Sequence, residues 1–152
     1  MANTQSMCTS FLSELMLGNQ NFTTGTGNAY KAALYLVSAT IDAATTVYTV
    51  TGEVSGTNYV AGGISVTNGT SPLSTNSTAT AGTAYWTPSA SLVYTTVTLA
   101  TAFNAVLLYN STNSNKAVSV HTFGSQTITA GTFTLTMPVN AVATGLIRLA
   151  TV

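Results

Sequence analysis

The feature that most constrains the fold is a two-residue alternation of apolar and hydroxyl side chains in the last quarter of the chain. Residues 132–137 read Thr-Phe-Thr-Leu-Thr-Met, so three apolar side chains alternate with three threonines. A β-strand places successive side chains on opposite faces, whereas a helix would scatter this pattern around its axis. The alternation therefore predicts an antiparallel strand with one face in the core and a threonine-coated face toward solvent.

Further β-type patterns run from Tyr30 onward, separated by Gly, Asn and Pro. Asn and Gly tolerate the positive φ of tight turns, and proline cannot donate to a β-ladder. Residues 103–109 are apolar on both faces, so this strand is expected to be central or covered. The predicted strands are 30–37, 46–51, 59–60, 64–67, 84–87, 92–99, 103–109, 117–122, 127–129, 132–137 and 145–149. Turns are expected at 62–63, 68–69, 110–116 and 130–131, and a loop is expected at 71–82.

One segment near the N-terminus follows a helical period instead. Apolar residues at 8, 11, 12, 15 and 16 match the spacing of an amphipathic helix. Thr4 or Ser6 can cap its start, and Gly18 can supply the left-handed residue at its end. The sequence thus predicts an N-terminal helix and loop arm over residues 1–28, followed by a β-sandwich domain over residues 29–152.

Many short strands joined by Gly and Asn turns are typical of β-sandwiches and barrels. The predicted fold class is therefore all-β: an antiparallel β-sandwich, Ig-like or jelly-roll-like, or a small barrel, with a short N-terminal α-helix. The length of 152 residues fits one such domain.

Charge is scarce in this chain. Charged residues make up 4% of the sequence, against about 25% in an ordinary soluble domain, and the formal net charge is zero. A nucleic-acid partner is not expected, because phosphate neutralisation needs clustered Lys and Arg. A membrane partner is not expected either, because the longest apolar run, 32–37, is far short of the roughly 20 residues that a spanning helix needs. The six charged residues are Lys31, Lys116, Arg148, Glu14, Asp42 and Glu53.

The residue types needed for catalysis are few and dispersed. His121 is the single histidine of the sequence, and it shares one face of its predicted strand with Ser119 while Val118 and Val120 share the other. We expect the two valines to face the core, which makes His121 a surface or interface residue. The sequence holds no Gly-x-Ser-x-Gly motif for a nucleophilic serine. We therefore expect no catalytic residues and no enzymatic activity.

Metal and cofactor sites are not expected either. One cysteine, Cys8, and one histidine cannot complete a zinc tetrad, and three carboxylates on separate elements offer little to calcium. The pair Tyr85-Trp86 has two interpretations that the sequence leaves open. The single tryptophan either packs in the core or serves as an interface anchor.

The apolar stripe of the predicted helix also has two interpretations. It either covers an open end of the sandwich or packs on a neighbouring subunit, and we expect it to be buried at least partly by a neighbouring chain. The candidate interface residues are Phe11, Leu12, Leu15, Met16, Tyr59 and Trp86.

Two scarce charges lie in turn-rich segments, Glu53 in residues 53–63 and Lys116 in residues 108–118. They suggest the hypothesis of a Glu53–Lys116 ion pair that pins two loops. The alternative, two solvated charges that never meet, stays open.

These same segments carry a family resemblance. Three stretches and two shorter segments are similar to sequences in small structural proteins of tailed bacteriophages, and together they span roughly residues 7–150. The stretches are Tyr48-x-x-Thr51-Gly52-Glu53-Val54-Ser55-Gly56-Thr57-x-Tyr59-x-Ala61-Gly62-Gly63, Leu108-Tyr109-Asn110-Ser111-x-x-Ser114-Asn115-Lys116-Ala117-Val118, and Phe123-Gly124-Ser125 through Gly131-x-Phe133-x-Leu135-x-Met137-Pro138. The shorter segments are Met7-Cys8-Thr9-Ser10-Phe11 and Gly145-Leu146-Ile147-Arg148-Leu149-Ala150.

The resemblance implies a virion structural protein, made in the bacterial cytoplasm and located on the capsid surface. A capsid cement or decoration protein that stabilises the assembled head is the favoured interpretation. Its expected partners are the major capsid protein and itself, as a homodimer or homotrimer. A tail or fibre component, including a receptor-contacting domain, is the main alternative. A carbohydrate-binding sandwich that uses Trp86 and Tyr85 as a stacking platform is the alternative from another class.

Overall fold

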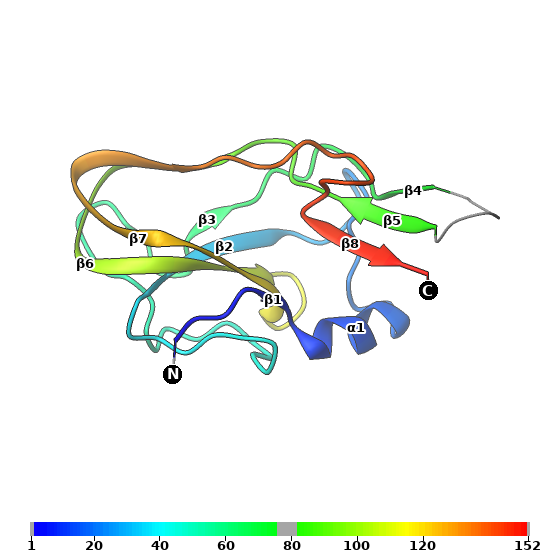
Figure 1. Ribbon diagram of the computed structural model, residues 1–152, viewed down its shortest axis with the longest axis horizontal. Coiled ribbons are helices and arrows are strands. Elements are labelled where there is room, and N and C mark those ends of the chain that lie inside the picture. Colours follow the sequence, from blue (N-terminus) through cyan, green and yellow to red (C-terminus); the bar gives the residue numbers. More distant parts are fainter. Residues whose placement is uncertain (1, 76–81, 152) are drawn as a thin grey trace.

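The computed structural model describes residues 2–75 and 82–151, and it contains two antiparallel sheets and one short helix (Figure 1). A five-stranded sheet has the order β1-β7-β6-β2-β3, and a three-stranded sheet has the order β4-β5-β8. The predicted all-β sandwich with a short helix is confirmed, and the sheets do not close into a barrel. The elements are β1 (Ser6–Met7), α1 (Thr9–Met16), β2 (Tyr30–Leu36), β3 (Ile64–Ser65), β4 (Leu73–Thr75), β5 (Thr83–Trp86), β6 (Leu92–Asn110), β7 (Lys116–Leu135) and β8 (Ile147–Ala150).

The hairpin of β6 and β7 forms the frame of the molecule. These strands are 19 and 20 residues long, and each one contains segments that were predicted as separate strands. Register shifts interrupt the β6–β7 ladder at several points, and Ala130 takes a φ of 47°. Such bulges bend a strand without ending it. The predicted turn at 130–131 is therefore wrong, because these residues form a bend inside β7.

The far half of this hairpin curls back over the central sheet, as Figure 1 shows. Phe103 and Phe133, which lie in the near and far halves, meet edge to face with ring centroids 5.1 Å apart. The Tyr94 hydroxyl in the far half donates a hydrogen bond to the Ala32 carbonyl of β2 at 2.8 Å. The alternation at 132–137 is confirmed, because its threonines are exposed and its apolar side chains are half-buried.

The strand at 103–109 is covered on both faces, as its apolar sequence predicts. Six of these seven residues are buried and Asn104 is half-buried. The same core includes Cys8 and Phe11, so the helix packs on the strands. The boundary at residue 28 stays a prediction, since residues on both sides of it share one core.

The helix begins after Cys8 as N-cap, which makes no side-chain capping bond, so neither Thr4 nor Ser6 caps it. Gly18 takes a φ of 71° just beyond the helix end, as predicted. No helix in the described part of the chain is long and apolar enough to cross a membrane.

Two predicted strands, 46–51 and 59–60, are wrong, and two short strands were not predicted. Residues 47–63 form a loop that meets the sheet through isolated bridges, such as Val47 with Lys116, and through side chains. The unpredicted strands are β1 and β4. Strand β4 occupies part of the expected loop at 71–82, of which residues 76–81 lie outside the described residues.

Candidate functional site

Helix α1 has a buried face and an exposed face, and both carry apolar side chains. Phe11 is fully buried, and Leu15 is partly buried against the core. Leu12 is 44% exposed and Met16 is 84% exposed, as is most of Leu17 beyond the helix end. One chain alone therefore leaves Leu12 and Met16 of this stripe uncovered. The burial of the stripe by a neighbouring chain stays a prediction.

Glu14 lies on the buried face of α1 beside Phe11, where an apolar side chain would be expected. Its carboxylate pairs with the Lys116 ammonium at 3.1 Å and accepts a 2.6 Å hydrogen bond from the Gln20 amide. The Asn110 amide in turn donates to Gln20 at 2.9 Å. We call these four residues the Glu14 network. The hypothesised Glu53–Lys116 pair is therefore wrong, because the lysine binds a carboxylate 102 positions away.

Glu53 is buried, and no cation in the described part of the chain pairs with it. One carboxylate oxygen accepts from the Tyr48 hydroxyl at 2.6 Å, and the other accepts from the Tyr59 hydroxyl and the Gly62 N–H, both at 2.8 Å. The Tyr48 ring stacks on Tyr109 with centroids 4.7 Å apart. We call this set of residues the Glu53 cluster, and it fastens the 47–63 loop to the sheet.

Tyr59 belongs to this cluster and is not a free interface residue. Its hydroxyl donates to Glu53 and accepts the backbone N–H of Leu34 at 2.9 Å. Burial is the largest cause that raises the pKa of Tyr59. The side chain is half-buried, and its hydrogen bonds give it a structural role in one chain.

Trp86 is a core residue, so its assignment as an interface anchor is wrong. It is 2% exposed, and its indole N–H donates to the Asn68 side chain and the Thr70 carbonyl. Its ring packs on Phe22 with centroids 4.6 Å apart. A buried indole cannot stack on a sugar, so the platform of Trp86 and Tyr85 does not exist in this structure.

An apolar groove of about 220 Å³ lies between α1 and the three-stranded sheet. Leu15 lines one side, and Tyr85, Ile147 and Leu149 line the other. The groove and the exposed residues Leu12, Met16 and Leu17 place apolar surface on both sides of the same short helix.

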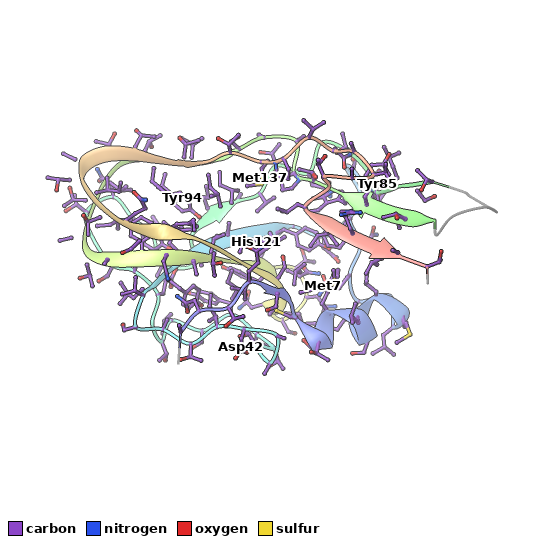
Figure 2. The ribbon with its side chains drawn as sticks, in the orientation of Figure 1. Met7, Asp42, Tyr85, Tyr94, His121 and Met137 are labelled. Atoms are coloured by element: carbon purple, nitrogen blue, oxygen red, sulfur yellow. The ribbon has the colours of Figure 1, made fainter. Side chains whose placement is uncertain are left out.

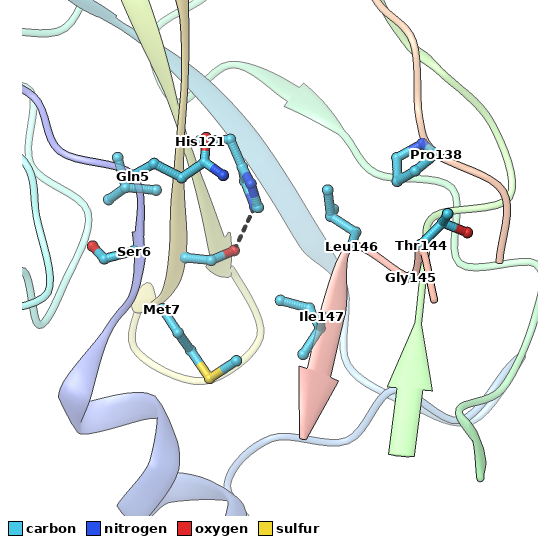
Figure 3. Close-up of a pocket in the computed structure, with 11 residues that line it drawn as sticks. Gln5, Ser6, Met7, His121, Pro138, Thr144, Gly145, Leu146 and Ile147 are labelled. Carbon is cyan, nitrogen blue, oxygen red and sulfur yellow. Dashed lines mark hydrogen bonds between the residues drawn. The ribbon is translucent and has the colours of Figure 1, made fainter. Parts of the chain in front are cut away.

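Ser119 and His121 lie on a covered face of β7. Ser119 is 2% exposed, and its hydroxyl oxygen is 2.8 Å from the Nε2 atom of His121 (dashed line in Figure 3). Burial lowers the pKa of His121 to about 4, so the imidazole is neutral at pH 7. The expected outer position of this histidine is therefore wrong, because the curled hairpin and residues 138–147 cover that face. Figure 2 shows His121 near the centre of that view, and the residue is half-buried.

This Ser–His pair borders a cavity of about 430 Å³ that no carboxylate of the described residues lines. A serine nucleophile needs a base held by an orienting group. A neutral imidazole with so low a pKa is also a weak base. The arrangement can donate and accept hydrogen bonds to an uncharged molecule.

The surface carries even less charge than the composition implies. Glu14 and Glu53 are buried, and three further charged residues are half-buried. Of the six charged residues, Arg148 is the exposed one. The half-buried residues are Lys31, Asp42 and Lys116.

Within the described residues, no group of three His, Cys, Asp or Glu side chains could hold a metal ion. In comparisons with protein-family models, curated proteins and solved structures, nothing matched this chain. The Glu14 network was not predicted. Its signal is that Glu14 follows Phe11 by three positions, which places the carboxylate on the buried helix face.

Proposed function

We propose that this protein is a structural component of a tailed-bacteriophage virion, namely a capsid cement or decoration protein that binds and stabilises the assembled head. Its partners are the major capsid protein and further copies of itself on the capsid surface. The observation that carries the proposal is the nearly uncharged surface: among the described residues, Arg148 is the one exposed charged side chain, and three others are half-buried. Such a surface costs less to desolvate than a charged one, and zero net charge promotes association.

The outer face of α1 is the proposed contact surface. We define it by Leu12, Met16 and Leu17, which are 44%, 84% and 72% exposed. An exposed patch of large apolar side chains of this kind is typical of a protein–protein contact site. The eight-residue helix also has little stability of its own, because isolated helices of this length are marginal in water. A neighbouring chain in the lattice supplies the missing cover.

The mechanism is thermodynamic linkage. A protein that binds the assembled shell, and not its dissociated subunits, stabilises the shell by mass action. Each contact can be weak, because chains that also contact one another bind with an effective concentration set by the lattice. Because few ion pairs contribute to such contacts, salt screens little of the binding energy.

The experiment measures binding of the purified protein to heads of the phage that encodes it, prepared without the protein. We expect saturable binding, a raised temperature of head disruption, and nearly equal affinity at low and molar NaCl. Release of the protein by molar salt, or no binding to heads, would overturn the proposal. Density on the tail in a map of the virion would instead support the tail or fibre alternative.

A pair of variants tests the contact surface. Leu12→Ser with Met16→Ser changes two exposed side chains, so the fold should survive, whereas a change at the fully buried Phe11 would unfold the helix packing. We expect this double variant to lose most head binding. The matched control is Val47→Ser with Val139→Ser, which removes apolar groups that are 46% and 75% exposed elsewhere. Equal binding by both double variants would remove α1 from the interface.

A further inference from the structure

Two cavities meet at His121. The larger, of about 430 Å³, is the one in Figure 3, between β1 and β7 on one side and residues 144–147 on the other. The smaller, of about 110 Å³, is lined by residues of the central sheet and of the curled hairpin. His121, Pro138 and Leu146 line both cavities, so the two lie next to each other there.

The two cavities differ in chemistry. The outer one carries uncharged polar groups, namely the Gln5 amide, the Thr144 hydroxyl and the Ser119–His121 pair. The inner one is lined almost entirely by aliphatic carbon, including Val106, Leu108 and Leu135. No Asp, Glu, Lys or Arg of the described residues lines either cavity.

We propose that the joined cavities are a binding site for a small uncharged amphiphile, with a hydroxyl or amide head in the outer cavity and a short aliphatic tail in the inner one. The outer volume falls in the roughly 300–1,000 Å³ range of small-molecule pockets. An apolar cavity of the inner kind stays dry and accepts apolar guests. This inference is independent of the proposed virion role.

The Ser119–His121 pair supplies the polar recognition. The hydrogen bond between Ser119 Oγ and His121 Nε2 orients the ring, and no hydrogen bond among the described residues uses its other nitrogen, Nδ1, to which we assign the head group. Because burial lowers the pKa of His121 to about 4, the ring carries no charge at neutral pH. A charged ligand would lose its hydration here without gaining an ion partner.

The probe is 1-hexanol at pH 7, with hexanoate and hexylammonium as charged analogues of equal length and glycerol as a head group without a tail. Backbone amide NMR shifts and the thermal midpoint are followed in titrations of the full chain. We expect saturable shifts at His121 and Leu146 and a raised midpoint with hexanol. The three other probes should bind at least about tenfold more weakly.

Leu146→Trp adds side-chain volume where the two cavities meet and should abolish hexanol binding. The matched control, Leu149→Trp, places the same bulk in the apolar groove beside α1 and should leave binding unchanged. Met137→Phe fills the inner cavity from another side if the first variant does not fold. Shifts that do not saturate, charged analogues that bind equally well, or equal effects of Leu146→Trp and Leu149→Trp would each overturn the proposal.

Discussion

Two buried carboxylates hold this fold together in different ways. Glu14 pairs with a cation, Lys116, and so joins the helix to the first residue of β7. Glu53 meets no cation of the described residues within 4 Å and is held by two tyrosine hydroxyls and one backbone N–H. Hydrogen bonds to a charged acceptor are about twice as strong as neutral ones. A chain with six charges can therefore bury a carboxylate among tyrosines without a second charge.

The two carboxylates also differ in how far along the chain their partners lie. The partners of Glu53 lie within 9 positions of it and close one loop, whereas Glu14 and Lys116 are 102 positions apart. Loss of the Glu53 cluster should release loop 47–63, and loss of the Glu14 network should loosen the helix from the sheet.

The largest expected effect is that of Glu53→Ala. This change leaves the Tyr48 and Tyr59 hydroxyls and the Gly62 N–H without their acceptor, so we expect the free energy of unfolding to fall by roughly 3 kcal/mol or more. Urea denaturation measures it. Glu53→Gln keeps one acceptor oxygen and should lose about half as much. A loss below about 1 kcal/mol for the alanine variant would show that the cluster does not fasten the loop.

A smaller effect is expected for Lys116→Met, which keeps the aliphatic stem and removes the charge. The Lys116 side chain is 29% exposed and that of Glu14 is 6% exposed, so water screens part of the pair. We expect a loss of about 1–2 kcal/mol, between the values for surface and buried pairs.

A double-mutant cycle with Glu14→Gln isolates the pair, and its coupling should shrink at molar salt. The matched control is Arg148→Met, at the exposed cation, with an expected change below about 0.5 kcal/mol. If Arg148→Met lowers the free energy of unfolding as much as Lys116→Met does, the ion pair with Glu14 does not account for the loss at Lys116.

The parts of the fold that could be predicted are those whose signal lies within a few residues. The alternation at 132–137 indicates a half-buried strand directly, and the apolar spacing from Cys8 to Met16 indicates a helix. The length of the hairpin could not be predicted, because a Gly or Ala that bends a strand looks the same in sequence as one that ends it. Residues 46–51 alternate like a strand, yet their backbone follows a loop that side chains hold.

The candidate site was harder to predict than the fold. The exposed apolar surface of Leu12 and Met16 depends on which helix face Glu14 occupies. The partner of Glu14 is Lys116, which no local pattern connects to the helix. The burial of His121 follows from a hairpin that folds back on itself, so the covered face could not be read from strand 117–122 alone. Trp86 had both interpretations open, and packing on Phe22 decided for the core.

The smallest expected effect is an alkaline loss of stability, to which each carboxylate contributes differently. Burial, and after it the hydrogen bond that Tyr48 donates to Glu53, raises the pKa of Tyr48, whereas burial alone raises that of Tyr30 beside the Glu14 network. Burial raises the pKa of Tyr109 to about 12, with a further contribution from the charge of Glu53. The native state therefore keeps these protons at a pH where the unfolded chain, with a tyrosine pKa of about 10, releases them.

The stability that these tyrosines contribute is complete below pH about 10 and falls as the pH rises, because the folded state then binds more protons than the unfolded state. Each one should account for about 0.4 kcal/mol of lost stability at pH 10. Tyr48→Phe and Tyr30→Phe should each reduce the loss of stability between pH 8 and pH about 10 by that amount, measured by denaturation at each pH. In a Glu53→Gln background, spectroscopic titration should find a lower pKa for Tyr48 and an unchanged one for Tyr30. Equal shifts of both would mean that burial, and not the Glu53 charge, sets the difference between the two regions.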